Sequence, residues 1–381
     1  MPEALIVTAV RTPIGRAVKG MLREVRPDDL VAGVIGTAVE RSGLDPDLLT
    51  DHALGTAYPE GRQGANLARR ASLLAGLPIG LPGSTINRFC ASSLQALRVA
   101  THALWSGEAG AYLVSGVESV SQVGRTTREE DKHPAFSNGT LADVYVPMGV
   151  TAENVADRFG VTREDMDRYA LRSHEKAVAA QDSGLLARSI VPVALPDGTV
   201  VAADDGPRRD TSLERLATLP PAFRENGVVT AGNSCPLNDG AAAAVVVTEE
   251  TANREGLTPR ARIVATGASG VDPSVMGIGP IEAVRDVLSR TGLRIEDIDV
   301  VEFNEAFASQ VLAVCREVGI DQDRQLNPAG GAIALGHPFG MTGIRLICTL
   351  LDNLDAAGGR YGLATLCVGG GQGMAVLLER L

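Results

Sequence analysis

The sequence predicts an α/β protein made of two lobes of the same kind, with an inserted segment between them. Residues 4–117 alternate short apolar strands with amphipathic helices, and this alternation returns from about residue 260 onward. The stretch between them, residues 120–238, is polar and punctuated by Pro and Gly. Alternating strands and helices are typical of βαβ units around a parallel or mixed sheet. A chain of 381 residues also exceeds what one small core organises.

The elements of the first lobe follow from two patterns. Continuous apolar runs bounded by turns indicate buried strands, and apolar residues three and four apart indicate helices. These patterns predict strands at 4–10, 83–89 and 111–117, and helices at 28–43, 65–76 and 90–107. The run AAAAVVVT at 241–248 returns to the buried-strand pattern after the insertion, whose one clear helix spans 162–183.

The second lobe repeats this arrangement. Its predicted strands lie at 261–269, 297–303, 361–368 and 374–381, and its helices at 280–292, 305–319 and 343–354. The repetition, in pattern more than in identity, indicates internal duplication. We expect an N-terminal lobe of residues 1–119 with 239–258, an inserted loop domain of 120–238 and a C-terminal lobe of 259–381.

Composition excludes several classes of protein. The net charge of −11 and an aromatic content of 3% argue against nucleic-acid binding and against an anionic membrane surface. Five cysteines without a C-x-x-C pair argue against a zinc site or a disulfide framework. No signal peptide and no apolar run of roughly 20 residues are present, so a cytoplasmic protein is expected.

Cys90 is the first candidate for chemistry. It lies where a predicted strand meets a predicted helix, and the free N–H groups and dipole of a helix start favour a thiolate. We therefore expect a lowered pKa for this thiol. The competing interpretation is a small buried core residue.

Three further positions lie at strand or helix ends. His337 lies within residues 327–343, a segment with five glycines, which suits close backbone approach to a ligand; a surface His that caps the next helix is the alternative. Cys367 precedes three glycines, whose N–H groups can stabilise an oxyanion, or which form an ordinary turn. Asn304 follows strand 297–303 and either N-caps the next helix or holds a water or carbonyl oxygen.

Taken in order, these segments resemble the thiolase family, and the likeness covers the whole chain. The motifs that carry it are V-x-A-V-R-T-P-I-G (7–15), N-R-F-C-A-S-S-L-Q-A (87–96), P-M-G-V-T-A-E-N-V-A (147–156), V-T-A-G-N-S-x-P-L-N-D-G-A-A-A (229–243) and M-G-I-G-P (276–280). The resemblance implies a thiolase-like fold, with duplicated βαβαβ-type lobes and mixed sheets in a layered α/β arrangement plus the inserted loop domain.

The resemblance also implies roles. Cys90 would be the nucleophile that becomes acylated, and His337 would activate it and bind the thioester oxygen together with a water held by Asn304. Cys367 would be the acid and base at the acetyl carbon. The backbone N–H groups of Cys90 and Gly369 would form a second oxyanion hole.

Coenzyme A is the implied co-substrate, with no metal and no tightly bound cofactor. Arg208, in D-D-G-P-R-R-D-T-S-L (204–213), matches the position that packs near the adenine. Cys235, Met148, Met276 and Phe307 are the other expected contacts to CoA or substrate. The implied partners are acyl-CoA thioesters and further copies of the chain, in a homodimer or homotetramer.

Several departures from the family pattern bear on the substrate. Pro147 stands where biosynthetic acetoacetyl-type members carry His, which favours a degradative 3-ketoacyl-CoA thiolase of fatty-acid or related β-oxidation. Cys235, Phe339 and Gln372 are expected to tune the acyl pocket. The alternatives are an acetyl-CoA acetyltransferase, a decarboxylating condensing enzyme of the ketoacyl-synthase type, and a binding protein that retains the fold.

Overall fold

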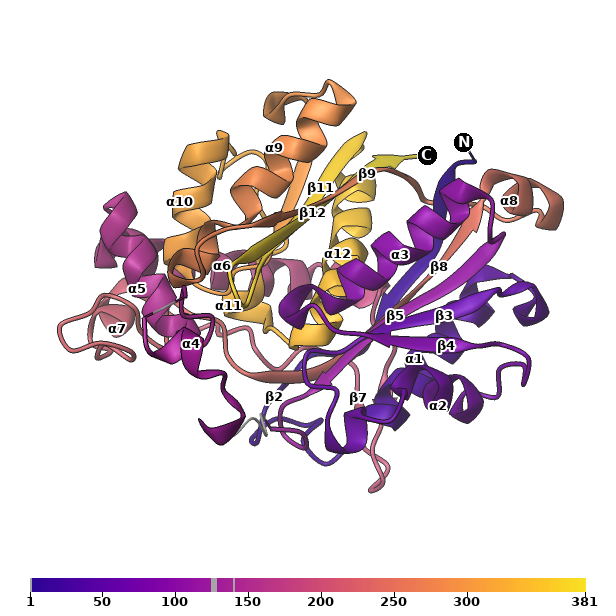
Figure 1. The fold of residues 1–381 in the computed structure, drawn as a ribbon, viewed down its shortest axis with the longest axis horizontal. Helices are drawn as coiled ribbons and strands as arrows, with labels where there is room; N and C mark the ends of the chain where they lie inside the picture. The colour runs from indigo at the N-terminus through magenta and orange to yellow at the C-terminus, as the bar shows by residue number, and fades with distance from the viewer. Residues whose placement is uncertain (1, 125–128, 140) are drawn as a thin grey trace.

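A computed structural model describes residues 2–124, 129–139 and 141–381. Within these residues the chain builds a ten-stranded mixed sheet with the order β10-β11-β12-β9-β1-β8-β5-β3-β4, and β2 pairs with β8 (Figure 1). The strands of its N-terminal half are β1 (Ala4–Arg11), β2 (Gly15–Arg16), β3 (Asp51–Gly55), β4 (Gly83–Ile86), β5 (Ala111–Ser119) and β8 (Asn238–Thr248). Those of its C-terminal half are β9 (Ala261–Gly270), β10 (Val300–Phe303), β11 (Tyr361–Val368) and β12 (Gln372–Arg380).

The helices follow the same division. The N-terminal half carries α1 (Pro27–Ser42), α2 (Leu67–Leu74), α3 (Ser92–Ser106) and α8 (Glu249–Glu255). The C-terminal half carries α9 (Pro280–Thr291), α10 (Ala308–Val318), α11 (Ala332–Leu335) and α12 (Thr342–Ala357). The segment between them contains α4 (Pro134–Ser137), α5 (Met148–Phe159), α6 (Arg163–Asp182), β6 (Val193–Ala194), β7 (Val200–Val201) and α7 (Leu213–Ala217).

The two halves of the sheet are duplicates in order and polarity. β3 is parallel to β5, which is antiparallel to β8, which is antiparallel to β1. β10, β11, β12 and β9 repeat this sequence of pairings. The halves meet where Leu5 and Ile6 of β1 pair with Arg262 and Ala261 of β9. The predicted duplication of βαβαβ-type lobes is confirmed, with the two mixed sheets joined by this short pairing.

Helices cover both faces of each half-sheet. α3 and α12 pack against each other and against strands of both halves in the central core. α1 and α2 cover the other face of the N-terminal half, and α9 and α10 cover that of the C-terminal half (Figure 1). The contact between α3 and α12 is close, because a Cβ at Gly343 would lie 2.3 Å from the Leu94 nitrogen. Since Cys90 precedes α3 and His337 precedes α12, this packing brings their loops together.

Among the elements that differ from the expectation are β3, α5 and β4. β3 was not predicted, because its sequence DHALG is short and contains His52 at a buried position. α5 was not predicted within the polar insertion, although Pro147 sets its N-cap. β4 ends at Ile86 instead of continuing to residue 89, because the chain turns there to present Cys90.

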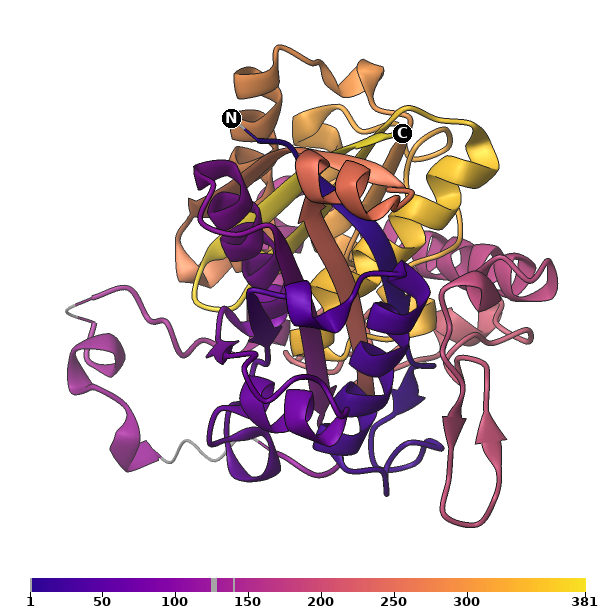
Figure 2. The same cartoon turned by 90° about the vertical axis from the view of Figure 1, so that its right-hand side faces the viewer.

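The inserted segment packs mainly on the C-terminal half. Side chains of α5, α6 and α7 join the apolar core of α9 and α10. Figure 2 shows α4 and the β6–β7 hairpin projecting away from the sheet. The boundaries proposed above for this segment, 120–238, stay a prediction.

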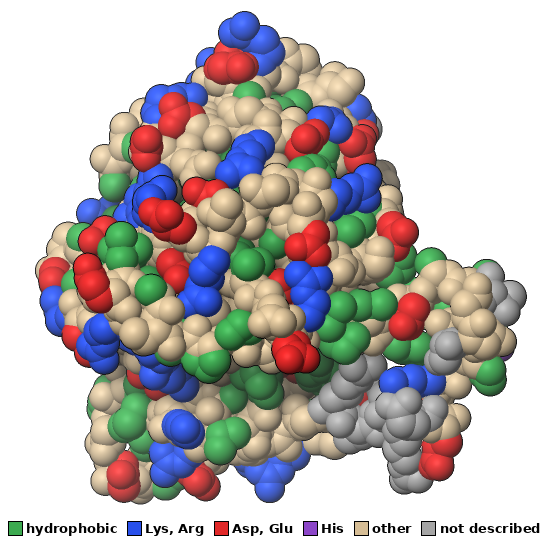
Figure 3. Space-filling view, turned by 90° about the vertical axis from the view of Figure 1, so that its left-hand side faces the viewer, with side chains coloured by type: hydrophobic (Ala, Val, Ile, Leu, Met, Phe, Trp, Pro, Cys, Tyr) green, Lys and Arg blue, Asp and Glu red, His purple; other side chains and the backbone are tan. Residues whose placement is uncertain are grey.

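No helix in the described part of the chain is both long and apolar enough to cross a membrane. On the face in Figure 3, acidic and basic side chains are interspersed.

Buried His52 predicts acid sensitivity of the fold. Its ring bonds Ala68 O, Ser72 and Ser115, and burial lowers its pKa to about 4. An unfolded His titrates near about 6.5, so between these values the unfolded chain binds more protons and stability falls as pH falls. We expect the free energy of unfolding to drop by roughly 2 kcal/mol between pH 7.5 and 5 from this residue alone.

Chemical denaturation at a series of pH values measures this effect. The H52Q variant has no ring to titrate, so its stability should fall less steeply below pH 6.5 by roughly one proton. An unchanged slope in H52Q would show that His52 does not control the acid sensitivity.

Candidate active site

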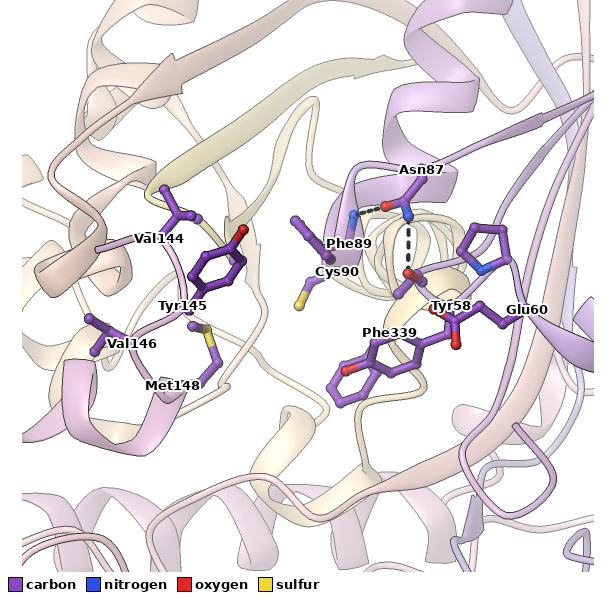
Figure 4. A pocket seen from close by; sticks show the side chains of 14 residues that line it. Tyr58, Glu60, Asn87, Phe89, Cys90, Val144, Tyr145, Val146, Met148 and Phe339 are labelled. Atoms are coloured by element: carbon purple, nitrogen blue, oxygen red, sulfur yellow. Dashed lines mark hydrogen bonds between the residues drawn. The ribbon is translucent and has the colours of Figure 1, made fainter. Parts of the chain in front are cut away.

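A cavity of about 400 Å³ opens where the loops before α3 and α12 meet the end of β11. Figure 4 shows the Cys90 sulfur pointing into it, between Tyr145 and Met148 on one side and Phe339 on the other. Its wall consists of Ala57, Tyr58, Pro59, Glu60, Asn87, Phe89, Cys90, Val144, Tyr145, Val146, Met148, Phe339, Gly369 and Gly370. Cys90, Met148 and Gly369 are thus the sequence-predicted site residues that face the cavity.

A strained turn presents Cys90. It lies in a short 3-10 helix, η3 (Phe89–Ala91), directly before α3. Phe89 adopts a φ of +44°, which is rare for a non-glycine residue and costs energy. The turn is held by Asn87, whose Oδ1 accepts from the Phe89 N–H at 2.8 Å, and by Ser92, whose Oγ accepts from the Arg88 N–H at 2.9 Å. The thiol is therefore fixed in position before any ligand arrives.

The expectation of a lowered Cys90 pKa is wrong. Burial raises the pKa of the thiol to about 12, a hydrogen bond from the Gly369 backbone N–H lowers it, and the Glu118 carboxylate raises it. Desolvation opposes charge on the thiol more strongly than the helix start favours it. Cys90 is therefore a neutral thiol at rest and needs a base when it reacts.

His337 has a defined tautomer. Arg345 donates from Nη2 to Asn304 Oδ1 at 3.3 Å, so the Asn304 Nδ2 group faces His337 Nε2, 3.3 Å away. Nε2 then carries the lone pair, and Nδ1–H donates to Thr342 Oγ1 at 2.7 Å. The Thr342 hydroxyl in turn donates to Pro338 O at 2.8 Å. The backbone N–H of His337 also donates to Asn238 Oδ1 at 2.9 Å.

Two simpler interpretations of these residues are wrong. His337 is buried and does not cap a helix at the surface, and Met341 is the N-cap of α12. Asn304 does not N-cap α10, whose N-cap is Phe307. Burial, with the nearby Arg345 charge, lowers the pKa of His337 to about 3. The imidazole is therefore neutral at physiological pH, with its lone pair available as an acceptor.

Cys367 lies at the end of β11, beside an apolar cluster. Its thiol donates to Gln310 Oε1 at 3.1 Å. Burial raises its pKa well above the usual value, and the neighbouring Cys90 and Cys235 thiols raise it further. The apolar cluster contains Met148, Ala152, Val229, Cys235, Met276, Ala306, Phe307 and Cys367. The cluster thus gathers all the predicted substrate contacts except Arg208, and Met148 connects it to the cavity.

Arg208 lies in a separate surface cavity of about 690 Å³. Its wall carries four arginines, Arg16, Arg208, Arg209 and Arg215, together with Asp205 and Asp210. Burial lowers the pKa of Arg208, and the nearby Arg16 charge lowers it further. A cluster of guanidinium groups is suited to binding phosphate oxygens. The predicted CoA contact Arg208 and the Cys90 thiol lie in different cavities.

Phe339 and Gln372, two residues that depart from the family pattern, contact the loops around the Cys90 cavity. The Phe339 ring packs edge-on against Tyr58 at 5.8 Å and against His337 at 5.0 Å between centroids. Gln372 accepts from Arg88 Nη1 at 3.3 Å and donates to Gly369 O at 3.2 Å. It therefore ties the turn before Cys90 to the glycine loop after Cys367.

Four supporting residues were missing from the sequence prediction: Thr342, Asn238, Gln310 and Arg345. Thr342 follows His337 by five residues in the glycine-rich segment, which was a usable signal. The others act from distant parts of the chain and were found only through the fold. Among the described residues, no three His, Cys, Asp or Glu side chains gather as a metal site requires.

Comparisons with known proteins match nearly the whole chain to one family. Residues 4–250 match the thiolase N-terminal domain and residues 257–380 the thiolase C-terminal domain. A beta-ketoadipyl-CoA thiolase of Pseudomonas aeruginosa is 47% identical, with 100% of this chain and 99% of that protein covered. A 3-ketoacyl-CoA thiolase of Bacillus subtilis is 42% identical, with both chains fully covered.

A solved structure extends the agreement to the fold. The acetyl-CoA acetyltransferase of Bacillus anthracis superimposes with a TM-score of 0.92 at 39% identity, covering 100% of this chain and 99% of that one. The layered architecture and the family match lead to the same conclusion. The chain belongs to the thiolase family of acyltransferases.

Proposed function

We propose that the protein catalyses the reversible, CoA-dependent cleavage of 3-oxoacyl-CoA into acetyl-CoA and a shortened acyl-CoA. The observation that carries this proposal is the position of the Cys90 thiol, which faces a cavity, accepts a hydrogen bond from the Gly369 N–H and has a second thiol, Cys367, nearby. Cleavage of a carbon–carbon bond needs a nucleophile, a base, a proton donor and donors for an oxyanion.

In the first half-reaction the Cys90 sulfur attacks C3 of the 3-oxoacyl group, and its proton passes to His337 Nε2. The pKa values of about 12 for Cys90 and about 3 for His337 mean that no thiolate–imidazolium pair is populated at rest. Proton transfer therefore accompanies attack, as negative charge moves to the C3 oxygen and is held by N–H groups.

Collapse of this adduct breaks the C2–C3 bond. The electron pair passes to C2, and the resulting enolate of acetyl-CoA takes a proton from the Cys367 thiol. The Asn304 Nδ2 group lies 3.3 Å from His337 Nε2, and once His337 has taken the Cys90 proton both groups can donate to a water or to the thioester oxygen. In the second half-reaction the Cys367 thiolate takes the proton of the CoA thiol, and the CoA sulfur attacks the acyl-Cys90 thioester. The shortened acyl-CoA is released, and the proton held by His337 returns to the Cys90 sulfur.

The names of the relatives narrow the choice of acyl chain in the substrate. The names of several full-length relatives specify beta-ketoadipyl-CoA, and one of Escherichia coli K12, 45% identical, is a 3-oxoadipyl-CoA/3-oxo-5,6-dehydrosuberyl-CoA thiolase. These names support a dicarboxylic 3-oxoacyl chain rather than the fatty-acid substrate expected from Pro147. Acetoacetyl-CoA synthesis is the second candidate, supported by the acetyl-CoA acetyltransferase that shares the fold.

A matched pair of substrates tests this assignment. 3-Oxoadipyl-CoA and 3-oxohexanoyl-CoA have the same chain length and differ in the terminal carboxylate. Because the names of the relatives specify the dicarboxylic acyl chain, we expect kcat/KM for thiolysis to favour 3-oxoadipyl-CoA by about 10- to 100-fold, the size of discrimination by a single group. Equal values would show a broad 3-ketoacyl-CoA thiolase. Activity confined to acetoacetyl-CoA would show an acetyl-CoA acetyltransferase, and CO2 release from malonyl-CoA a decarboxylating enzyme.

A further inference from the structure

Arg345 is a fully buried guanidinium in the first turns of α12, outside the cavity wall. Within the described residues its Nε and Nη1 atoms have no hydrogen-bond partner. Taking a cation out of water without satisfying its donors is costly. The one hydrogen bond its side chain makes there is to the catalytic candidate Asn304, from Nη2 to Oδ1 at 3.3 Å.

The neighbouring Glu302 compensates the charge without using those donors. Its carboxylate lies 3.8 Å from Arg345 Nη1, an ion pair beyond hydrogen-bond distance. Glu302 instead accepts from Thr349 Oγ1 at 2.9 Å and from Asn353 Nδ2 at 2.8 Å, both on α12. The Glu302 carboxylate therefore stabilises the charge of Arg345, whereas the guanidinium donates its hydrogen bond to Asn304.

The direction of that contact decides how the Asn304 amide is oriented. An amide can be turned so that its oxygen and nitrogen exchange places, but a guanidinium donates only. The oxygen must then face Arg345, and the NH2 group must face His337 Nε2. If the amide were turned over, its NH2 would meet the guanidinium donors, and its oxygen would meet the Nε2 lone pair. The His337 proton would then favour Nε2, where it blocks the base.

We propose that Arg345 is a positioning residue that orients the Asn304 amide and thereby keeps His337 in the Nδ1–H tautomer, with Nε2 unprotonated and able to act as a base. The proposal rests on the function proposed above. Arg345 touches neither substrate nor thiol in this scheme and acts through Asn304. Its loss should lower turnover without weakening substrate binding.

A double-mutant cycle with Asn304 tests the proposal. In thiolysis by the otherwise wild-type enzyme, R345M should lower kcat on the order of 100-fold, the lower end of one general-base contribution, and leave KM within about threefold. In an N304A background the same change should lower kcat by less than about threefold, because the residue through which it acts is gone. Equal losses of kcat in both backgrounds would overturn the proposal.

A matched control and a spectroscopic readout separate this role from a purely structural one. T349V removes a hydrogen bond to the same Glu302 but leaves the Arg345–Asn304 contact, so its kcat should stay within about threefold of wild type. In enzyme labelled with 15N-histidine, His337 should show the Nδ1–H tautomer in wild type and gain the Nε2–H tautomer in R345M.

R345Q covers the case in which R345M does not fold. Its amide can turn either its oxygen or its NH2 group toward Asn304, so it no longer fixes the direction of that contact. A folded R345Q or R345M with an unchanged His337 tautomer would overturn the proposal. If the wild-type enzyme showed no thiolysis of any 3-oxoacyl-CoA, the proposed function would fail, whereas the tautomer measurement would still report on Arg345.

Discussion

Replacing Cys90 by serine is expected to lower thiolysis by on the order of 10⁴-fold, since a hydroxyl is a far weaker nucleophile than a thiol at neutral pH. The side chain lies at a cavity wall, held by a turn whose hydrogen bonds come from Asn87 and Ser92 rather than from Cys90 itself. The variant should therefore fold as wild type does. Steady-state kinetics measure the loss of thiolysis, and intact-protein mass spectrometry after incubation with acyl-CoA measures the loss of the acyl adduct on residue 90.

C315S provides the matched control. Cys315 is also a free cysteine, but it is buried on α10 in the core of the C-terminal half, outside the cavity wall. Its replacement should leave both turnover and the acyl adduct in place. Retention of more than about one per cent of wild-type activity in C90S would remove Cys90 from its role as the nucleophile.

The candidate site was predictable because its residues lie at the ends of elements that the sequence marks clearly. Cys90, Asn304, His337 and Cys367 each follow or precede an apolar run or a glycine cluster. The duplicated topology carries them toward one place, since α3 and α12 occupy equivalent positions in the two halves and pack on each other. Local pattern and global fold agree here, which makes the inference from sequence effective.

Protonation was not predictable in the same way. The start of a helix is visible in a sequence, but desolvation of Cys90 depends on loops from three distant segments, including Tyr58, Tyr145 and Phe339. The tautomer of His337 likewise depends on the direction of the hydrogen bond between Arg345 and Asn304. Burial and hydrogen-bond direction arise from tertiary packing, so they appear only in the structure.

C367A is expected to separate the two kinds of chemistry that the site performs. Cleavage of the C2–C3 bond needs a proton at C2, whereas acylation of Cys90 by acetyl-CoA needs only the thiol, a base and an oxyanion hole. Thiolysis should therefore fall by about 10³-fold, in the middle of the range for one acid–base contribution, while acetylation of Cys90 by acetyl-CoA should stay within about tenfold of wild type.

Two measurements on C367A decide this. Intact mass after mixing with acetyl-CoA reports acetyl-Cys90, and exchange of the acetyl methyl protons with deuterium from solvent reports proton movement at that carbon. Equal loss of acetylation and cleavage would assign Cys367 a part in both half-reactions, and unchanged cleavage would exclude it as the proton donor. The melting temperature serves as the control, because removing a buried sulfur next to Met276 and Phe307 leaves a small void.

The high pKa of Cys367 makes this separation possible. Burial and two neighbouring thiols keep its proton in place at rest, with the thiol donating to Gln310. A thiol with so high a pKa is a weak acid and protonates only a strong base. The enolate at C2 is the strongest base formed in the cycle. Burial also raises the pKa of Cys90, which must give up its proton earlier, but a hydrogen bond from the Gly369 N–H partly offsets that rise. The two thiols thus differ in their surroundings in the direction that their different roles require.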